Sequence, residues 1–424
     1  MSAIASSERE IANWLAERRG AMLSLLSDLV GIDSGTSNIG GVEAMATRID
    51  DFLRQSNLAP TPLRGSGYGG GLRVELPGSD NDKSMLLMGH LDTVFPAGEA
   101  ARRPFTISGG RASGPGVADM KAGLVMNSFV LAAFRTCGGN ARPLVGLYTG
   151  DEEVGSPASR QIIEAEARNA AYSFNSEPGR ASGNVVTARR GGIFMRLSIK
   201  GKAAHSGIDI RVGVNAIDEL AHKILALHAL TNFDADVVVN VGVASGGQSV
   251  NTTAPSAEAL IDLRFGSFGD RDRLMAAISA IVERSWTAGS SAALKITGEF
   301  VPLAATRASM KLFHLYQLAA RDLGFAVEAE ATGGCADSGF AAAMGATTLC
   351  GLGPVGGNAH SPDEYVEIET IVPRAQAVAL TILRLGASAA ARHSSLPAGE
   401  AFHPSARKGS QRPTREACHD ESDF

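Results

Sequence analysis

Five short stretches of the sequence contain side chains that could bind metal ions. Each holds a histidine or a carboxylate, and each also contains glycine. The candidate ligands are His90, Asp119, Glu153, Glu177 and His360. Two imidazoles and three carboxylates suit zinc, which accepts nitrogen and oxygen ligands and keeps one position open for water at catalytic sites. Two zinc ions that share a carboxylate and a water would lie about 3.5–4 Å apart. We therefore predict a dinuclear site with two Zn²⁺ ions per chain.

Two further acidic residues lie next to candidate ligands. Asp92 comes two residues after His90, where it could accept a hydrogen bond from the second nitrogen of a metal-bound imidazole. Glu152 and Glu153 are adjacent, so their side chains point in different directions. One of them could bind metal while its neighbour faces the bound water, which is the position of a general base. We assign Glu153 as the ligand and Glu152 as the base.

Each candidate has a plainer interpretation when it is taken alone. A His-x-Asp pair is common on protein surfaces, and an acidic run such as 151–153 is usually a solvated turn. Asp119 could be an ordinary turn residue in a glycine-rich loop, and His360 could cap a turn before Ser-Pro. The occurrence of all five ligands in order, behind apolar segments, favours a metal site.

Four of the five stretches follow, directly or closely, an apolar segment that predicts a β-strand. These segments are 85–88, 144–148, 172–174 and 347–352. Helical segments alternate with them, the longest at about 121–137, which is typical of an α/β sheet. Ligands of open α/β sheets bind beyond the carboxyl ends of the strands. His90 and His360 can therefore converge although they are 270 positions apart in the sequence.

The pattern of the sequence changes between about residues 189 and 300. Apolar residues alternate with polar ones over 193–199, which predicts a half-buried strand. The elements that follow are a helix at about 214–230, strands at 237–243 and 257–265, a helix at about 271–288 and a strand at 294–300. This β-α-β-β-α-β order is that of a split βαβ sandwich and predicts a small α+β domain.

The segments on either side of this insertion share the α/β pattern. We predict a catalytic α/β domain formed by residues 1–188 and 301–388, which is interrupted by an inserted α+β domain over 189–300. Apolar runs such as 237–243 exceed what so small a domain needs to cover, so we expect a homodimer through the inserted domain. The tail, 389–424, is rich in serine, alanine, proline and charged residues and is predicted to be disordered.

Composition and charge exclude other classes of protein. The 424 residues include 39 basic and 44 acidic side chains, a net charge of −5, whereas a general nucleic-acid binder would be basic. The N-terminal segment lacks the apolar core of a signal peptide. We also expect no apolar stretch to reach the ~18 residues that a membrane span needs. The prediction is a cytoplasmic protein with no nucleic-acid or membrane partner.

The five stretches resemble those of the co-catalytic dizinc peptidase and aminoacylase superfamily. They read GHLDTVFP, GPGVADMKAG, TGDEEVGS, NSEPGR and GNAHSPDEY, and the resemblance extends over about residues 20–388. The branch of bacterial glutamate carboxypeptidases is the most similar, through GKAAHSGIDIRVGVNAI, TGGCADSGFAAAMG and HSPDEYVEI. Acetylornithine deacetylase and succinyl-diaminopimelate desuccinylase are relatives in the same superfamily. The resemblance implies an α/β/α catalytic domain with a mixed sheet, and an insertion that serves as lid and dimerisation domain.

The resemblance also implies how the ligands are divided between the metals. One zinc would bind His90, Asp119 and Glu177. The other would bind His360, Asp119 and Glu153, so that Asp119 bridges the pair.

Three acidic residues match superfamily roles individually. Glu152 matches the general base, and Asp92 matches the residue that orients the imidazole. Glu177 stands where the aminopeptidases of the superfamily tend to carry aspartate, so it favours the carboxypeptidase and deacylase branch.

Five residues are candidate substrate contacts, and one of them, Arg264, has a basis in the strand pattern. Arg264 lies on the face of strand 257–265 opposite the apolar one, and its guanidinium could bind a carboxylate with two hydrogen bonds. An exposed arginine at the end of a strand is the plainer interpretation, and the resemblance favours the carboxylate. The resemblance implies that His205 reaches the substrate carbonyl of a partner subunit as an oxyanion donor, and that Asn251 is a polar substrate contact. Gly333 and Gly334 could let the substrate approach the backbone closely.

We therefore predict a zinc-dependent amidohydrolase that cleaves an amide or peptide bond and releases a free amino acid. The substrate would be a small molecule with a free carboxylate, and the activity would be similar to that of glutamate carboxypeptidase. The main alternative is an N-acyl-amino-acid deacylase. A carbamoylase and a catalytically dead homologue that binds amino acids are further alternatives, and the second should have lost Glu152 or a ligand.

Overall fold

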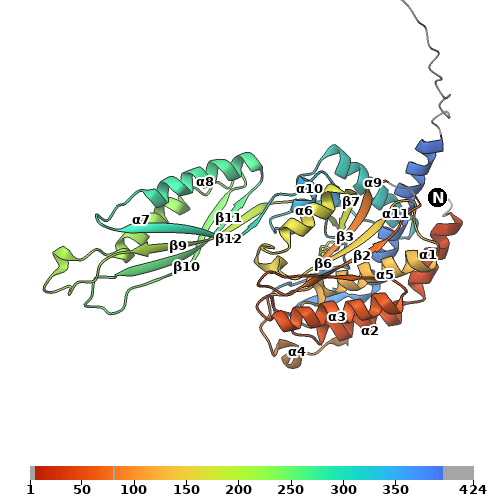
Figure 1. The fold of residues 1–424 in the computed structure, drawn as a ribbon, viewed down its shortest axis with the longest axis horizontal. Coiled ribbons are helices and arrows are strands. Elements are labelled where there is room, and N and C mark those ends of the chain that lie inside the picture. The colour runs from red at the N-terminus through yellow and green to blue at the C-terminus, as the bar shows by residue number, and fades with distance from the viewer. Residues whose placement is uncertain (1–4, 80–81, 395–424) are drawn as a thin grey trace, which may run out of the picture.

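The computed structural model of the protein describes residues 5–79 and 82–394. Its largest sheet has six strands in the order β1-β2-β6-β3-β7-β14 (Figure 1). In that order they are β1 (Thr61–Leu63), β2 (Gly71–Leu76), β6 (Leu144–Thr149), β3 (Ser84–His90), β7 (Ala170–Asn175) and β14 (Thr347–Leu349). The last four are parallel, whereas β1 and β2 run antiparallel to their neighbours, so the sheet is mixed.

Helices cover both faces of this sheet, because its central strands are apolar on both sides. Side chains alternate along a strand, so Met85 and Leu87 of β3 pack on one face while Leu86 and Met88 pack on the other. The core on the first face includes α1 (Ser6–Ala16), α2 (Arg19–Val30), α3 (Ile39–Gln55), α5 (Ala122–Thr136), α9 (Arg307–Asp322) and α11 (Ile371–Ser394). The core on the other face includes α6 (Arg160–Arg168) and α10 (Ser338–Ala343). These layers form an α/β/α sandwich.

The central helix α5 corrects one expectation from composition. Together with the turn before it, the stretch Val117–Thr136 is long and apolar enough to span a membrane. However, 94% of its most apolar window is buried inside the protein, where α5 contacts β3, β6 and other helices of the first face. Its length and apolarity therefore reflect its place in the core.

A second sheet lies apart from the first (Figure 1). Its strands are antiparallel, in the order β10-β11-β9-β12. They are β10 (Val238–Gly246), β11 (Ser256–Phe265), β9 (Gly191–Lys200) and β12 (Ser291–Phe300). The helices α7 (Ala216–His228) and α8 (Phe268–Glu283) cover one face, against which the odd-numbered residues from Ile193 to Ile199 pack. We call this unit, from β9 to β12, the lid.

The chain order β9-α7-β10-β11-α8-β12 is the predicted β-α-β-β-α-β order. Together with the mixed six-stranded sheet, it confirms the predicted fold class. The domain boundaries at 188/189 and 300/301 stay predictions, although the lid strands begin at Gly191 and end at Phe300. Helix α11 continues through Ser394, into the range predicted as a disordered tail. The rest of that range lies outside the described residues.

Several short elements surround the main sheet, and the sequence pattern does not predict them because they are too short to show a period. They are α4 (Glu99–Arg102), β4 (Thr106–Ser108), β5 (Arg111–Ser113), β15 (Gly356–Gly357), β16 (Tyr365–Glu367), β8 (Val185–Arg189) and β13 (Ala329–Thr332). The strand β16 pairs with β5. This pairing places the segment after His360 beside the segment that leads to Asp119.

The lid contacts the loop that follows strand β6 of the main sheet, backbone against backbone. Gly155 has a φ of +91°, and a Cβ atom there would lie 2.8 Å from the Cα atom of Gly298 in β12. A Cβ atom on Gly298 would overlap the carbonyl oxygen of Val154. Beside this contact, Arg160 forms an ion pair of 3.2 Å with Glu299. Strand β12 therefore rests on the loop that follows β6.

Candidate active site

Three parallel strands end at one edge of the main sheet, and a predicted site residue lies at or near each end. His90 is the last residue of β3, and Glu177 comes two residues after β7. Glu152 and Glu153 lie in a short helical turn after β6. Because the carboxyl ends of parallel strands share one edge, these four side chains meet there, as the sequence predicts.

Asp119 and His360 come from loops instead of strand ends. Asp119 lies in the turn Val117–Lys121 that precedes α5, and His360 lies between β15 and β16 with a φ of +64°. His360 is more distant from its predicted strand than the other ligands, since β14 ends at Leu349. The pairing of β16 with β5 is what brings its loop to the site.

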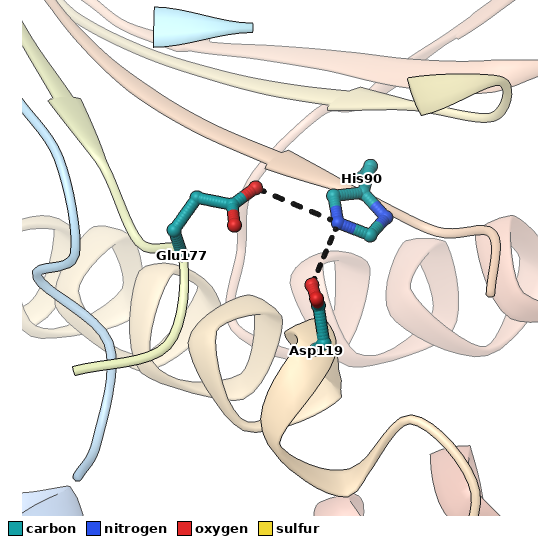
Figure 2. A group of neighbouring side chains, drawn as sticks. All are labelled: His90, Asp119 and Glu177. Atoms are coloured by element: carbon teal, nitrogen blue, oxygen red, sulfur yellow. Dashed lines mark hydrogen bonds and ion pairs between the residues drawn. The ribbon is translucent and has the colours of Figure 1, made fainter. Parts of the chain in front are cut away.

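The five predicted ligands form two groups that share Asp119. In the first, His90 Nε2 lies 3.1 Å from Asp119 Oδ1 and 3.6 Å from Glu177 Oε1 (Figure 2). In the second, His360 Nε2 lies 3.4 Å from Asp119 Oδ2 and 3.2 Å from Glu153 Oε2. Each oxygen of Asp119 thus faces a different imidazole.

The chemistry of these groups fits a pair of metal ions. The Oε1 atoms of Glu153 and Glu177 are buried, and neither has a hydrogen-bond partner among the described residues. A buried carboxylate oxygen without a partner is costly, and a cation would satisfy it. Each group also supplies three ligands, one imidazole and two carboxylates, and three protein ligands leave the fourth position of a catalytic zinc open for water.

The carboxylates draw protons onto the histidines when no metal is bound. Hydrogen bonds with Asp119 and Glu153 raise the pKa of His360 to about 10. Burial disfavours the charged form of Asp119, but its hydrogen bonds with His360 and His90 outweigh burial and lower its pKa below the ordinary value. Metal binding needs neutral imidazoles, so it must release these protons.

Asp92 holds the site together more broadly than the sequence predicts. Its carboxylate accepts hydrogen bonds from the Thr36 hydroxyl at 2.7 Å and from the backbone N–H groups of Glu152 at 3.1 Å and Glu153 at 3.2 Å. The hydrogen bond of His90 Nδ1, at 3.0 Å, is to the backbone oxygen of Asp92, and the carboxylate lies 3.4 Å away. Asp92 therefore positions the predicted base, Glu152, and the predicted ligand, Glu153, as well as the imidazole of His90.

Glu152 is suited to proton transfer. Its side chain is buried, and its Oε2 atom lies 4.0 Å from His90 Nε2. Burial raises the pKa of Glu152 well above its ordinary value, and the nearby charges of Glu177 and Asp337 raise it further, while that of His90 lowers it. A carboxylate with a raised pKa is a stronger base than an ordinary glutamate, so it can accept a proton and later return it.

Glu364 is a functional residue that sequence reasoning missed. Its buried carboxylate accepts three hydrogen bonds from the loop of the shared ligand: from the N–H groups of Gly116 at 3.1 Å, Ala118 at 2.8 Å and Asp119 at 2.9 Å. It also belongs to the loop of His360. One side chain therefore fixes two candidate ligands, Asp119 and His360, relative to each other. Nothing in the run Asp-Glu-Tyr distinguishes Glu364 from Asp363.

Replacing Glu364 by glutamine should weaken metal binding by about 10–100-fold, as is typical when a residue that orients a ligand is changed. The amide would leave at least one of the three N–H donors without an acceptor. Competition with a chromophoric chelator measures the affinity. Asp363→Asn is the matched control, because Asp363 is the exposed neighbour in the same loop. Equal affinities for the two variants would remove Glu364 from this role.

A cavity of about 600 Å³ opens over the two ligand groups. Its lining includes Glu152, four of the five ligands and, from the lid, Arg264 and Phe194. Arg264 thus lies in the same cavity as the metal groups, although 87 positions separate it from Glu177 in the sequence. The lining also includes Arg189, whose guanidinium lies 3.5 Å from the Glu177 carboxylate.

Three predicted substrate contacts do not line this cavity within the described part of the chain: His205, Asn251 and Gly333. The first two are exposed and adjacent on the lid, where the N–H of Ser206 donates to the Asn251 carbonyl at 3.0 Å. Gly334 does line the cavity. A Cβ atom at Gly334 would lie 3.5 Å from Arg189, an ordinary contact, so the chain itself does not require glycine there.

The family of the chain follows from a comparison with known proteins. The family model described as peptidase family M20/M25/M40 matches residues 86–384. The chain belongs to this family. Its match includes all of the predicted ligands and the lid. The M20 family implies metal ions, in agreement with the two groups of possible ligands.

Curated M20 relatives cover most of the chain. Carboxypeptidase G2 of Pseudomonas sp. (strain RS-16) is 30% identical over 380 residues, which are 88% of this chain and 91% of the relative. Acetylornithine deacetylase of Erwinia tasmaniensis is 28% identical, over 78% of this chain and 92% of the relative. These similarities confirm the resemblance stated from the motifs.

Solved structures agree with the fold. The M20 family metallo-carboxypeptidase Sso-CP2 from Sulfolobus solfataricus has a TM-score of 0.68 at 16% identity, and the match covers 85% of this chain and 98% of that one. Human carnosine dipeptidase 1 has a TM-score of 0.68 at 13% identity, over 90% of this chain and 100% of that one. At such identities the likeness concerns the fold alone.

Proposed function

We propose that the protein is a dizinc carboxypeptidase that hydrolyses an amide bond and releases a C-terminal amino acid with a free carboxylate. One observation carries this proposal: two metal-ligand groups that share Asp119 lie in one cavity with a buried acid, Glu152, and a cation, Arg264. The similarity to carboxypeptidase G2 supports it. It does not decide which amino acid is released.

The side chains of the cavity divide the chemistry between them. Zinc ions bound at the two groups would polarise the scissile carbonyl. They would also lower the pKa of a water molecule, so that it can lose a proton and attack at neutral pH. Glu152 accepts a proton from the attacking water and passes it to the leaving nitrogen. The carboxylate of Asp92 keeps Glu152 in place by accepting a hydrogen bond from the backbone N–H of Glu152. Arg264 binds the carboxylate of the substrate and so fixes the scissile bond beside Glu152.

A hydrolysis screen tests the function directly. Purified enzyme loaded with zinc is incubated with N-acyl amino acids, dipeptides, folyl-glutamate and N-carbamoyl amino acids, and the free amino acid is measured. We expect release from substrates with a free carboxylate and loss of activity with a chelator. Activity confined to N-carbamoyl substrates, or none on any of them, would refute the proposed function.

An N-acyl-amino-acid deacylase is the second candidate, because acetylornithine deacetylase is also a relative. Both activities would use the same acid, ligands and carboxylate contact. The screen separates them by the acyl group that is preferred. A dead homologue is not supported, since Glu152 and every predicted ligand are present.

Replacing Arg264 by alanine should lower kcat/KM for substrates with a free carboxylate. The loss of transition-state stabilisation should be about 2–5 kcal/mol, since a charged partner is removed from a partly buried site. Metal content should not change. Arg196→Ala is the matched control, because Arg196 is an exposed arginine on the neighbouring lid strand. If wild type cleaved an amidated substrate as fast as the free acid, Arg264 would not be the carboxylate contact.

We also propose that the lid forms a homodimer in which His205 of the partner subunit donates a hydrogen bond to the reacting carbonyl. His205 is exposed, and it is not among the described residues that line the cavity of its own chain, which supports this arrangement. The lid also exposes apolar side chains on α7 and β10, with Leu225 72% and Val243 55% exposed. Such a surface suits a two-fold contact.

Mixing two inactive variants tests this arrangement. Glu152→Ala and His205→Ala should each be inactive as homodimers. After subunit exchange, mixed dimers hold one complete site, so activity should return to roughly a quarter of the wild-type value. The assay follows hydrolysis together with exchange of labelled subunits. Proven exchange without activity would mean that His205 does not act across subunits.

A further inference from the structure

The part of the cavity beside Arg264 has an aromatic wall. In the lid sheet Phe194 lies directly opposite Asp262, so its side chain shares a face with Asp262 and Arg264. The Arg264 Cζ atom lies 5.4 Å from the centroid of the Phe194 ring. Phe300 meets that ring edge to face, with centroids 6.3 Å apart and an angle of 89°. Both rings line the cavity.

This wall is fixed before any substrate binds. Phe300 is only 4% exposed, and it stacks on the buried ring of Phe340 at 6.0 Å. Aromatic pairs in edge-to-face and stacked arrangements stabilise each other beyond simple burial. Phe194 therefore packs against a ring that is itself held in place, and its other surface faces the cavity.

The hydrogen bonds of Arg264 decide how a carboxylate would bind next to this wall. Its Nε atom donates to Asp262 at 3.0 Å, and its Nη1 atom lies 2.7 Å from the Cys335 sulfur. Nη2 has no partner among the residues that the structure describes. A substrate carboxylate would therefore bind at the Nη1–Nη2 edge. The side chain of that amino acid starts one carbon away from the carboxylate, within reach of the Phe194 ring.

The charges around the wall disfavour a second substrate carboxylate, on the side chain of the released amino acid. Two other arginines line the cavity, Arg180 and Arg189. Arg180 donates to Glu330 at 3.0 Å, and Arg189 donates to backbone oxygens and lies beside Glu177. Both are therefore already near an acidic partner. Asp262 adds a negative charge next to Arg264, and the faces of aromatic rings are also electron-rich.

We propose that the released amino acid carries an aromatic or large aliphatic side chain, which packs on Phe194, and that Phe194 determines this specificity. The inference rests on the proposed function and defines its substrate class. An apolar side chain that packs on this wall is removed from water, which favours its binding. An acidic side chain, as in glutamate, would have to leave water beside Asp262 and the two rings.

A matched substrate series tests the specificity. We expect kcat/KM for N-acetyl-L-phenylalanine and N-acetyl-L-leucine to exceed that for N-acetyl-L-glutamate by at least about 10-fold, the scale of discrimination by an apolar pocket. An equal or greater value for the glutamate substrate would overturn the proposal. Binding of the free amino acids tests the proposed specificity independently of the proposed function, because it requires no hydrolysis. Calorimetry with L-phenylalanine and L-glutamate needs no turnover, and L-phenylalanine should bind more tightly even if none of these substrates is hydrolysed.

The role of Phe194 is tested by substitution. Phe194→Ala should bring the phenylalanine-to-glutamate ratio of kcat/KM toward one, and Phe194→Leu should retain most of the preference. Phe233→Ala is the control, because Phe233 lies on the lid, is 81% exposed and does not line the cavity within the described residues. A loss that is equal for all substrates would show a merely structural role and would overturn the assignment.

Discussion

Replacing Glu152 by alanine should lower kcat by several orders of magnitude and leave both metals bound. Loss of a general base alone typically removes about 10²–10⁴-fold, and here the same group also returns the proton to the leaving nitrogen. Glu152 is not in either ligand group, so metal content should stay at the wild-type level. Single-turnover kinetics measure the rate of hydrolysis, and metal analysis of the same preparation measures the number of bound ions.

The neighbouring residue provides a sharp control for this result. Glu153→Gln changes the adjacent acid in the same turn, but it removes a ligand and should lower the metal content by about one ion per chain. The isosteric Glu152→Gln should behave like Glu152→Ala. If either Glu152 variant kept a large share of wild-type turnover, another group would be the base.

Replacing Asp119 by alanine should remove both metals. Its two oxygens face different histidines, at 3.1 Å from His90 and 3.4 Å from His360. Wild-type protein under zinc-replete conditions should hold about two zinc ions per chain, and the variant should hold close to none after dialysis. Elemental analysis by mass spectrometry measures this, with protein concentration from amino-acid analysis.

Glu177→Gln is the comparison for Asp119, since Glu177 belongs to one group only. It should lose about one ion per chain. Asp119→Ala with one ion retained would mean that the carboxylate does not bridge. Circular dichroism of each variant shows whether the fold remains, so that metal loss is not confused with unfolding.

The convergence of the candidate ligands could be predicted from sequence because their positions follow from sheet geometry. His90 and Glu177 lie at the ends of apolar parallel strands, and such strands converge at one edge. His360 was predictable only through its motif, because a pairing of three-residue strands, β16 with β5, brings its loop to the site. Strands so short leave no periodic pattern in the sequence.

Residues that act through the backbone were harder to predict. Asp92 accepts hydrogen bonds from the amides of Glu152 and Glu153, and Glu364 accepts three from the loop of Asp119. The backbone amide donor is the same for every residue type except proline, so a sequence carries no sign of such a bond. The spacing of Asp92 from His90 indicated a contact with the ring, and the larger role became visible only in three dimensions.

The contact between Gly155 and Gly298 has a consequence for protein engineering. Each glycine leaves room for the backbone of the other domain, so neither position accepts a side chain without separating β12 from the loop after β6. A chimera that takes its lid from another M20 enzyme must therefore exchange β12 together with the loop after β6, or keep glycine at both positions. A graft that places a larger residue at either position would tilt the new lid, and the lid residues that face the cavity would move away from the two ligand groups.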